Sequence, residues 1–221
     1  VIGTDDGLVQ ITLNGGDSWK KIDNIPGAPT QSYVNSVYTS HHDENVIYVA
    51  FNHHKYGDFK PYLFMSEDKG DSWISISSNL PSRGSVYAIE EDHIDSGLIF
   101  CGTEFGVFFS PNNGKTWKQL SNGLPTIAVR DIAIQRDMND LVLGTFGRGF
   151  YVLDDYSPLR TIENKKISQK AMIFSTREAI MWEKANPLGL PGKSFQGDNF
   201  YTGDNLDPVA MINYYYNENY K

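Results

Sequence analysis

The eight residues Ser110-Pro111-Asn112-Asn113-Gly114-Lys115-Thr116-Trp117 follow a pattern that occurs three times in this chain. The pattern Ser/Thr-x-Asp/Asn-x-Gly-x-Ser/Thr-Trp is found again at Thr12–Trp19 and at Ser66–Trp73. The three tryptophans are 54 and 44 residues apart. A repeat of this period is typical of proteins in which each unit is one small antiparallel sheet.

Each copy, here called a repeat turn, has the composition of a tight turn between two strands. The Asp or Asn side chain can accept backbone N–H groups of its own turn. The glycine supplies a positive φ, and the tryptophan begins the next strand and buries a large ring. We therefore assign structural roles to Asn14, Gly16, Trp19, Asp68, Gly70, Trp73, Asn112, Gly114 and Trp117.

Short apolar segments on both sides of the repeat turns are expected to be strands. One predicted sheet contains residues 85–91, 97–103, 107–110 and 116–120, and the sheet before it contains 33–39, 46–51, 62–66 and 72–77. The next contains 129–135, 141–145, 150–154 and 159–162, and residues 1–22 supply three strands of an earlier sheet. We predict an all-β chain of three to four antiparallel blades, at least three of them four-stranded, that form part of a β-propeller.

The repeat turns resemble those of the Asp-box, or bacterial neuraminidase repeat, superfamily, and especially the sortilin-type propellers of secreted bacterial proteins. Residues 141–155 and 157–160 resemble the closing blade of that group, which tends to lack a repeat turn. The resemblance implies a secreted or cell-surface protein of a Gram-negative bacterium, with an immunoglobulin-like β-domain after the propeller. It divides the chain into a propeller part (1–162), a linker with an extended loop (163–208) and the first strand of a following β-domain (209–221).

Composition limits the classes of partner. The net charge is −8, and no Lys/Arg cluster larger than a pair such as Lys165-Lys166 is present, which argues against nucleic acid as the partner. No run of eighteen apolar residues is present, so we expect no transmembrane helix, and no cofactor motif is found. The single cysteine, Cys101, follows three apolar residues and is expected to be a buried strand thiol.

The chain opens on residues that read as mid-strand, and three to four blades do not close a typical propeller ring. An open propeller would expose a strand edge, which favours aggregation. We therefore expect the remaining blades to come from a longer polypeptide or from another chain.

Ligand-binding residues are expected on the propeller face opposite the repeat turns, where the turns between second and third strands lie. The candidates are His53, His54, Tyr56, Phe59, Glu104 and Arg148. Tyr56 and Phe59 can stack on a sugar or a peptide side chain, although Phe59 can equally lie under its own loop, 52–61. Arg148 can bind an acidic ligand group or lock the ring, and the locking role is preferred.

Two chemical alternatives use the same face. A metal site at His53, His54 and Asp58 is disfavoured, because adjacent histidines in an extended segment point to different sides. Glycoside hydrolysis needs two carboxylates on one face, for which Asp58 and Glu104, or Asp5 and Asp6 with either, are the candidates. Acidic turn residues more commonly accept backbone hydrogen bonds. We therefore predict a non-catalytic scaffold that binds peptide, protein or glycan, with a glycoside hydrolase as the alternative.

Overall fold

The computed structural model describes residues 1–162, 170–183, 203 and 207–216. The chain divides into two compact units, Val1–Lys166 and Ile167–Lys221. The described regular structure consists of strands and two short 3₁₀ helices. Among the described residues, no helix is long and apolar enough to cross a membrane.

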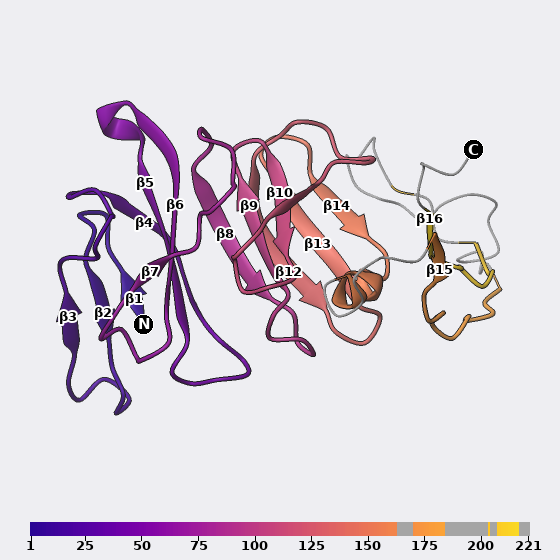
Figure 1. Ribbon diagram of the computed structural model, residues 1–221, viewed down its shortest axis with the longest axis horizontal. Coiled ribbons are helices and arrows are strands. Elements are labelled where there is room, and N and C mark those ends of the chain that lie inside the picture. Colours follow the sequence, from indigo (N-terminus) through magenta and orange to yellow (C-terminus); the bar gives the residue numbers. More distant parts are fainter. Residues whose placement is uncertain (163–169, 184–202, 204–206, 217–221) are drawn as a thin grey trace, which may run out of the picture. The chain divides into compact units, whose positions relative to one another are not determined.

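Four antiparallel sheets, here called blades 1 to 4, follow one another along the first unit (Figure 1). Blade 1 comprises β1 (Ile2–Gly3), β2 (Val9–Ile11) and β3 (Lys20–Ile22), and blade 2 comprises β4 (Tyr33–Thr39), β5 (Ile47–His53), β6 (Asp58–Ser66) and β7 (Ile74–Ser75). Blade 3 comprises β8 (Val86–Glu91), β9 (Ile99–Thr103), β10 (Gly106–Ser110) and β11 (Lys118–Leu120), and blade 4 comprises β12 (Val129–Gln135), β13 (Asp140–Thr145) and β14 (Phe150–Leu153). Each strand pairs with its neighbour in sequence.

The architecture predicted from the sequence is confirmed, with two corrections in detail. Among the described sheets, two have four strands. The prediction of a strand at 159–162 is wrong, because the 3₁₀ helix η2 (Ser157–Thr161) lies there. The Asp155 side chain accepts both the N–H and the hydroxyl of Ser157, at 3.3 and 2.6 Å, and Pro158 is favoured in a first helical turn. The loop expected at 52–61 is instead mostly hairpin, since β5 and β6 extend into it and only η1 (His54–Tyr56) and Gly57 separate them.

The hydrophobic core lies between neighbouring blades. Leu63 and Ile76 of blade 2 pack with Ile89 and Cys101 of blade 3, and all four are buried. Equivalent clusters join blades 1 and 2 and blades 3 and 4. The Cys101 thiol is buried, as expected, and burial raises its pKa.

All three repeat turns form the same hydrogen bonds, which confirms their predicted role. In the second, the Ser66 hydroxyl donates to Asp68 and accepts the Gly70 N–H, each at 2.8 Å. Asp68 also accepts the Ser72 N–H at 2.8 Å. The corresponding acceptors in the other turns are Asn14, with the Ser18 N–H at 3.0 Å, and Asn112, with the Thr116 N–H at 2.9 Å.

Each repeat turn that has a blade before it packs on that blade. The Trp117 ring is 3% exposed, and its Nε1–H donates to the carbonyl of Ile76 in blade 2 at 2.7 Å. A Cβ on Gly114 would lie only 2.6 Å from Cβ of Ile76. Trp19 is 42% exposed, so its predicted burial is wrong. Trp117 is covered by the blade that precedes its own, whereas no described sheet precedes blade 1 to cover Trp19.

Blade 4 differs from blades 2 and 3 at its outer edge. Where those blades carry β7 and β11, the edge of β14 pairs with no other described strand. An apolar groove of about 430 Å³ lies beside it, lined in part by Leu120, Leu141, Tyr151 and Val152. In the second unit, Ala171–Ile173, which we expected in the linker, forms β15 and pairs with β16 (Tyr214–Tyr216).

Candidate functional site

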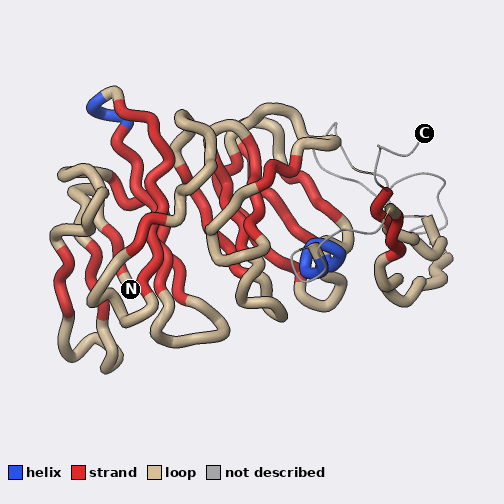
Figure 2. The backbone as a smooth tube through the Cα atoms, viewed as in Figure 1, coloured by secondary structure: helices blue, strands red, loops and turns tan. Residues whose placement is uncertain are grey.

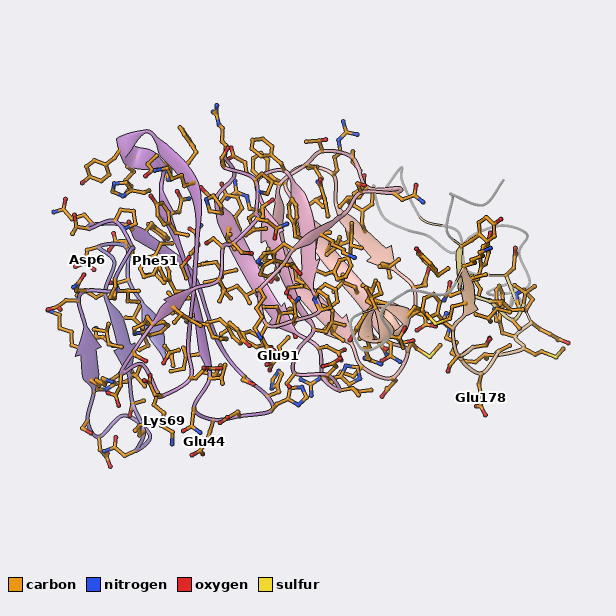
Figure 3. All side chains as sticks on the ribbon, viewed as in Figure 1. Asp6, Glu44, Phe51, Lys69, Glu91 and Glu178 are labelled. Atoms are coloured by element: carbon orange, nitrogen blue, oxygen red, sulfur yellow. The ribbon has the colours of Figure 1, made fainter. Side chains whose placement is uncertain are left out.

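The candidate site lies at the end of the blades that carries η1, here called the η1 face. In antiparallel blades, the turns between second and third strands and the links between blades share one end, and the repeat turns lie at the other. Figure 2 shows η1 at one end of blade 2, and Figure 3 shows Lys69 and Glu44 at the opposite end. The η1 face therefore contains η1, the β9–β10 and β13–β14 turns and the links before β4, β8 and β12.

The η1 hairpin presents an aromatic ring that is held in place by the link from blade 1. The Tyr56 ring is 61% exposed and stacks on His53 at a centroid distance of 4.4 Å. The Tyr56 hydroxyl donates to Gln31 at 2.8 Å, and His53 Nδ1 lies 3.2 Å from the Ser32 hydroxyl. This ring is fixed from two sides, so it can bind a ligand with little loss of side-chain entropy.

The two adjacent histidines have different partners. The His54 N–H and Nδ1 lie 2.9 and 2.7 Å from the Asn52 side-chain oxygen, whereas His53 faces Ser32 and Tyr56. Among the described residues, no group of three or more His, Cys, Asp or Glu side chains is placed to hold a metal ion.

The base of the hairpin contacts the link between blades 2 and 3. The Arg83 guanidinium lies 4.8 Å from the Phe59 ring centroid, and the Gly84 N–H donates to the Phe59 carbonyl at 2.7 Å. Phe59 is half-buried, and one face of its ring is covered by Arg83. Gly84 in turn lies against Phe105, which continues the aromatic surface into blade 3.

The first strand of each of blades 2, 3 and 4 has a β-bulge at the same place. The register of these strands shifts at Asn35, Tyr87 and Arg130. A bulge turns one side chain away from its regular direction. Asn35 donates to the Val86 carbonyl of blade 3 at 2.7 Å, and Tyr87 contacts Arg130 of blade 4. The bulges thus direct one side chain per blade into a contact with a neighbouring blade.

Arg130 lies between aromatic rings from two blades. Its guanidinium carbon is 3.8 Å from the Tyr87 ring centroid and 5.4 Å from that of Phe146. Phe146, in the β13–β14 turn, is 69% exposed, and its N–H donates to Ala128 at 2.9 Å. Burial raises the pKa of Tyr87, Arg130 opposes this shift, and nearby Glu104 adds to it. The aromatic and cationic surface therefore continues from blade 2 to blade 4.

Tyr87 and Arg130 are site residues that were not predicted from the sequence. The signal that could have identified them is the alignment of Val34-Asn35, Val86-Tyr87 and Val129-Arg130, each at the start of the first strand of a blade. In every case the valine is buried and the next residue is at the bulge.

The two candidate catalytic carboxylates have different environments. Asp58 accepts the Tyr62 hydroxyl at 2.6 Å and the Lys60 N–H at 3.1 Å, and the Tyr62 bond lowers the Asp58 pKa. Asp58 is therefore unsuited to donate a proton near neutral pH. Glu104 has one buried carboxylate oxygen, Oε2, with no hydrogen-bond partner. Of these two carboxylates, Glu104 is therefore the one with an oxygen that has no hydrogen-bond partner among the described residues.

Arg148 does not have the structural role that we preferred for it. Its side chain is exposed in the β13–β14 turn, and it forms no ion pair with any described residue. An arginine with a locking role is instead Arg160 of η2. Arg160 donates to both carboxylate oxygens of the fully buried Asp92, at 2.8 and 2.7 Å.

A second group of titratable side chains lies on the inner strands. Burial raises the pKa of Glu90 on β8 to about 7, although the Tyr38 hydroxyl, 3.4 Å away, and Arg136 oppose the shift. Glu91 beside it is fully buried and accepts the Ser40 hydroxyl at 2.7 Å. These bonds join blade 2 to blade 3, and we assign this group to the interface between the blades.

Comparison with solved structures places these four sheets in a known architecture. YCF48 bound to D1 peptide aligns with a TM-score of 0.52 over 70% of this chain, at 17% identity. The chain adopts the β-propeller fold. An ancestral GH74 enzyme (TM-score 0.51, 17% identity, 68% of this chain) and a GH74 xyloglucanase from Xanthomonas campestris (0.50, 15%, 63%) have the same propeller architecture.

These alignments concern the propeller fold alone. The chain covers 46% of YCF48, 20% of the ancestral GH74 enzyme and 23% of the Xanthomonas campestris enzyme. No profile of a known protein family matches the chain, and no curated protein matches it. Propellers with such different roles share a scaffold, so function has to be argued from the site.

Proposed function

We propose that this chain is a non-catalytic binding propeller of a secreted or cell-surface protein that recognises a peptide, protein or glycan through its η1 face. One observation carries the proposal: aromatic rings and cations follow one another across blades 2, 3 and 4. The row contains Tyr56, Phe59, Arg83, Phe105, Tyr87, Arg130 and Phe146.

The physical properties of this surface suit recognition. Exposed aromatic rings provide a large contact area with few rotatable bonds, and residues of this kind dominate binding energy at interfaces. Tyr56 and Phe146 are 61% and 69% exposed. The Tyr56 hydroxyl bonds Gln31, and Phe146 is held by its backbone N–H on Ala128 and by the Arg130 guanidinium over its ring. The surface is thus rigid before a ligand arrives, which reduces the entropic cost of binding.

The resemblance to Asp-box and sortilin-type propellers supports the placement outside the cell. The repeat turns carry that resemblance, and their identical hydrogen bonds agree with it. The exposed Trp19 and the groove beside β14 also support our proposal that further sheets, from the same polypeptide or another chain, cover the outer faces of blades 1 and 4.

The test is binding of the full chain to peptide and glycan arrays, followed by titration of each hit. Tyr56→Ala and Phe146→Ala should each weaken saturable binding by about tenfold, since each removes an anchored ring from the contact. The matched control is Leu13→Ala, which truncates a 73% exposed apolar side chain in a repeat turn on the opposite face. No saturable hit on either array, or equal loss with all three variants, would refute the proposal.

Glu104 is the observation that favours a second candidate, a glycoside hydrolase. Its buried Oε2 atom has no hydrogen-bond partner in the protein, so it is available to contact a sugar, as one member of a catalytic carboxylate pair must. Hydrolysis assays on every glycan hit distinguish the two candidates. Product release that is abolished in Glu104→Gln would establish the hydrolase, whereas binding without turnover would establish the binding propeller.

A further inference from the structure

Four cations of the η1 face form no ion pair with any other described residue. Three of them lie over aromatic rings: Lys55 over Tyr33 at 5.8 Å, Arg83 over Phe59 at 4.8 Å and Arg130 over Tyr87 at 3.8 Å. A fourth, Arg148, is exposed in the β13–β14 turn. The ion pairs formed by described residues involve Lys20, Lys21, Lys69, His93 and Arg160 instead.

This absence of ion pairs contrasts with the overall charge. The chain has 27 acidic and 19 basic residues and a net charge of −8. Carboxylates also lie on or near the face: Asp5 and Asp6 in the β1–β2 turn of blade 1, and Asp58, Glu104 and Asp131 in blades 2 to 4. The Asp6 carboxylate accepts the Thr4 hydroxyl. Asp58 accepts the Tyr62 hydroxyl, Asp131 accepts the Ile132 N–H at 3.0 Å, and Glu104 has its Oε2 atom buried. The cations therefore retain free hydrogen-bond donors in a protein that is otherwise rich in acceptors.

Stacking prepares the arginines for a particular kind of ligand. A guanidinium that lies over an aromatic ring is held in one plane, while the N–H groups at its edge stay available. That edge matches the two oxygens of a carboxylate, and the resulting bidentate bonds are among the strongest polar contacts in proteins. Arg130 contacts two such rings, those of Tyr87 and Phe146.

The same stacking disfavours a sugar at these positions. Sugars bind aromatic residues through the open face of a ring, but one face of Phe59 and one of Tyr87 are taken by guanidinium groups, and one of Tyr56 by His53. At Phe59 and Tyr87 the surface instead presents the N–H edge of a guanidinium group.

Resting on the function proposed above, we infer that the ligand of the η1 face is an extended polypeptide segment rich in Asp and Glu. Its carboxylates pair with Arg83, Arg130 and the neighbouring cations Lys55 and Arg148. The exposed rings of Tyr56 and Phe146 contact the stems of its side chains.

The experiment uses the full chain and a twelve-residue peptide of alternating Glu and Ser, with the Gln-Ser peptide as the neutral probe. Fluorescence anisotropy should give saturable binding of the Glu peptide that weakens as salt is added, because screening acts on exposed charges. Arg130→Gln and Arg83→Gln should each weaken binding by about tenfold. Arg130→Lys, which keeps the charge but loses the planar fork, should also weaken it. Lys115→Gln, the same charge change in an exposed repeat-turn residue on the opposite face, should leave binding within about twofold.

Three results would overturn the inference. The first is equal affinity for the Glu and Gln peptides, and the second is unchanged affinity in Arg130→Gln when its thermal unfolding matches that of the unchanged chain. The third is binding of an oligogalacturonate of similar charge in place of the peptide, which would assign the cations to an acidic glycan. A neutral array hit that needs Tyr56 but not Arg130 would refute this inference alone and leave the proposed function standing. The absence of any array hit would refute both.

Discussion

At the scale of single residues, the repeat turns show which chemistry one position requires. Asn14, Asp68 and Asn112 occupy equivalent places and make the same acceptor contact with the backbone four residues ahead. A neutral amide suffices at two of the three places, so the turn needs the acceptor oxygen and does not need a charge. The charge of Asp68 nevertheless adds a dependence on pH that the other two turns lack.

Asp68→Asn should make unfolding less sensitive to acid. Hydrogen bonds from the Ser72 hydroxyl and N–H, with the Ser66 hydroxyl, lower the pKa of Asp68 to about 2. A carboxyl group with a lowered folded-state pKa stabilises the fold above its ordinary pKa, near 3.8, and that contribution is lost as the pH falls towards 2. The melting temperature of the unchanged chain should therefore fall more steeply between pH 4 and pH 2 than that of Asp68→Asn.

The control for this prediction is Glu67→Gln, the same change of charge at the exposed neighbour. The melting temperature of Glu67→Gln should fall between pH 4 and pH 2 as steeply as that of the unchanged chain. A steeper acid loss in Asp68→Asn than in the unchanged chain would contradict the assignment of the charged form as the stabilising one.

Residues with a local signal were predictable, and residues positioned by strand pairing were not. The turn acceptors could be identified because their partners lie within four positions in sequence. Tyr87 and Arg130 were missed because a bulge is a property of two paired strands, and one strand alone shows only a buried valine before the bulge residue. The structural role of Arg160 was missed because its partner, Asp92, is 68 positions away in the sequence.

At the scale of elements, the repeat turn serves as a contact between blades as well as a link between strands. Gly70 and Gly114 lie against aliphatic side chains of the preceding blade, whereas a Cβ on Gly16 would meet only the ring of Trp19, at 3.9 Å. The same motif thus has two environments in one chain. This difference allows the cost of the turn conformation to be separated from the cost of the contact.

Gly114→Ala should reduce the free energy of unfolding more than Gly16→Ala. Both glycines have a positive φ, +77° and +108°, so both variants strain the backbone, by about 1–2 kcal/mol. Only in Gly114→Ala does the new methyl group also meet Ile76, at 2.6 Å, which adds about 1–3 kcal/mol for overpacking. Urea unfolding of the two variants measures the difference, and equal losses would show that the turn makes no tight contact with blade 2.

Most strands could be predicted because apolar alternation and turn residues mark them locally. Residues 33–39 and 129–135 match β4 and β12 in full. The pattern failed at 159–162, where Leu159 and Ile162 are half-buried against blade 4 from a 3₁₀ helix and a strand-like pattern arises from helical packing. It failed again at 52–61, where polar residues suggested a loop but pairing of His53 with Asp58 continues the hairpin.

At the scale of the whole propeller unit, one buried ion pair connects the end of the propeller to its interior. Arg160 of η2 reaches Asp92, in the β8–β9 turn of blade 3, and donates also to Asn139 after β12, at 2.7 Å. Burial opposes ionisation of Asp92, but hydrogen bonds from Arg160 and Tyr156 keep its pKa below the ordinary value. Segments from blades 3 and 4 and from η2 thus meet at one carboxylate.

Arg160→Met should lower the free energy of unfolding by about 3 kcal/mol, because it leaves a buried carboxylate without its cation. The double variant Arg160→Met with Asp92→Asn should recover part of the loss, since it removes the unpaired charge as well. Guanidinium unfolding of the single and double variants gives the coupling energy. Losses that simply add would show that the two groups act independently.

The contact between blades has a consequence for how such a protein can grow. Blade 2 offers Ile76 to the repeat turn of blade 3, and the glycine of its own repeat turn, Gly70, lies against Ile11 and Ile22 of blade 1. A tandem duplication of the segment from one tryptophan to the next would therefore give the new copy, on each side, a surface that it already fits. The propeller can therefore gain whole blades. The bulge residues of the η1 face can be substituted while the contacts between repeat turns and preceding blades stay unchanged.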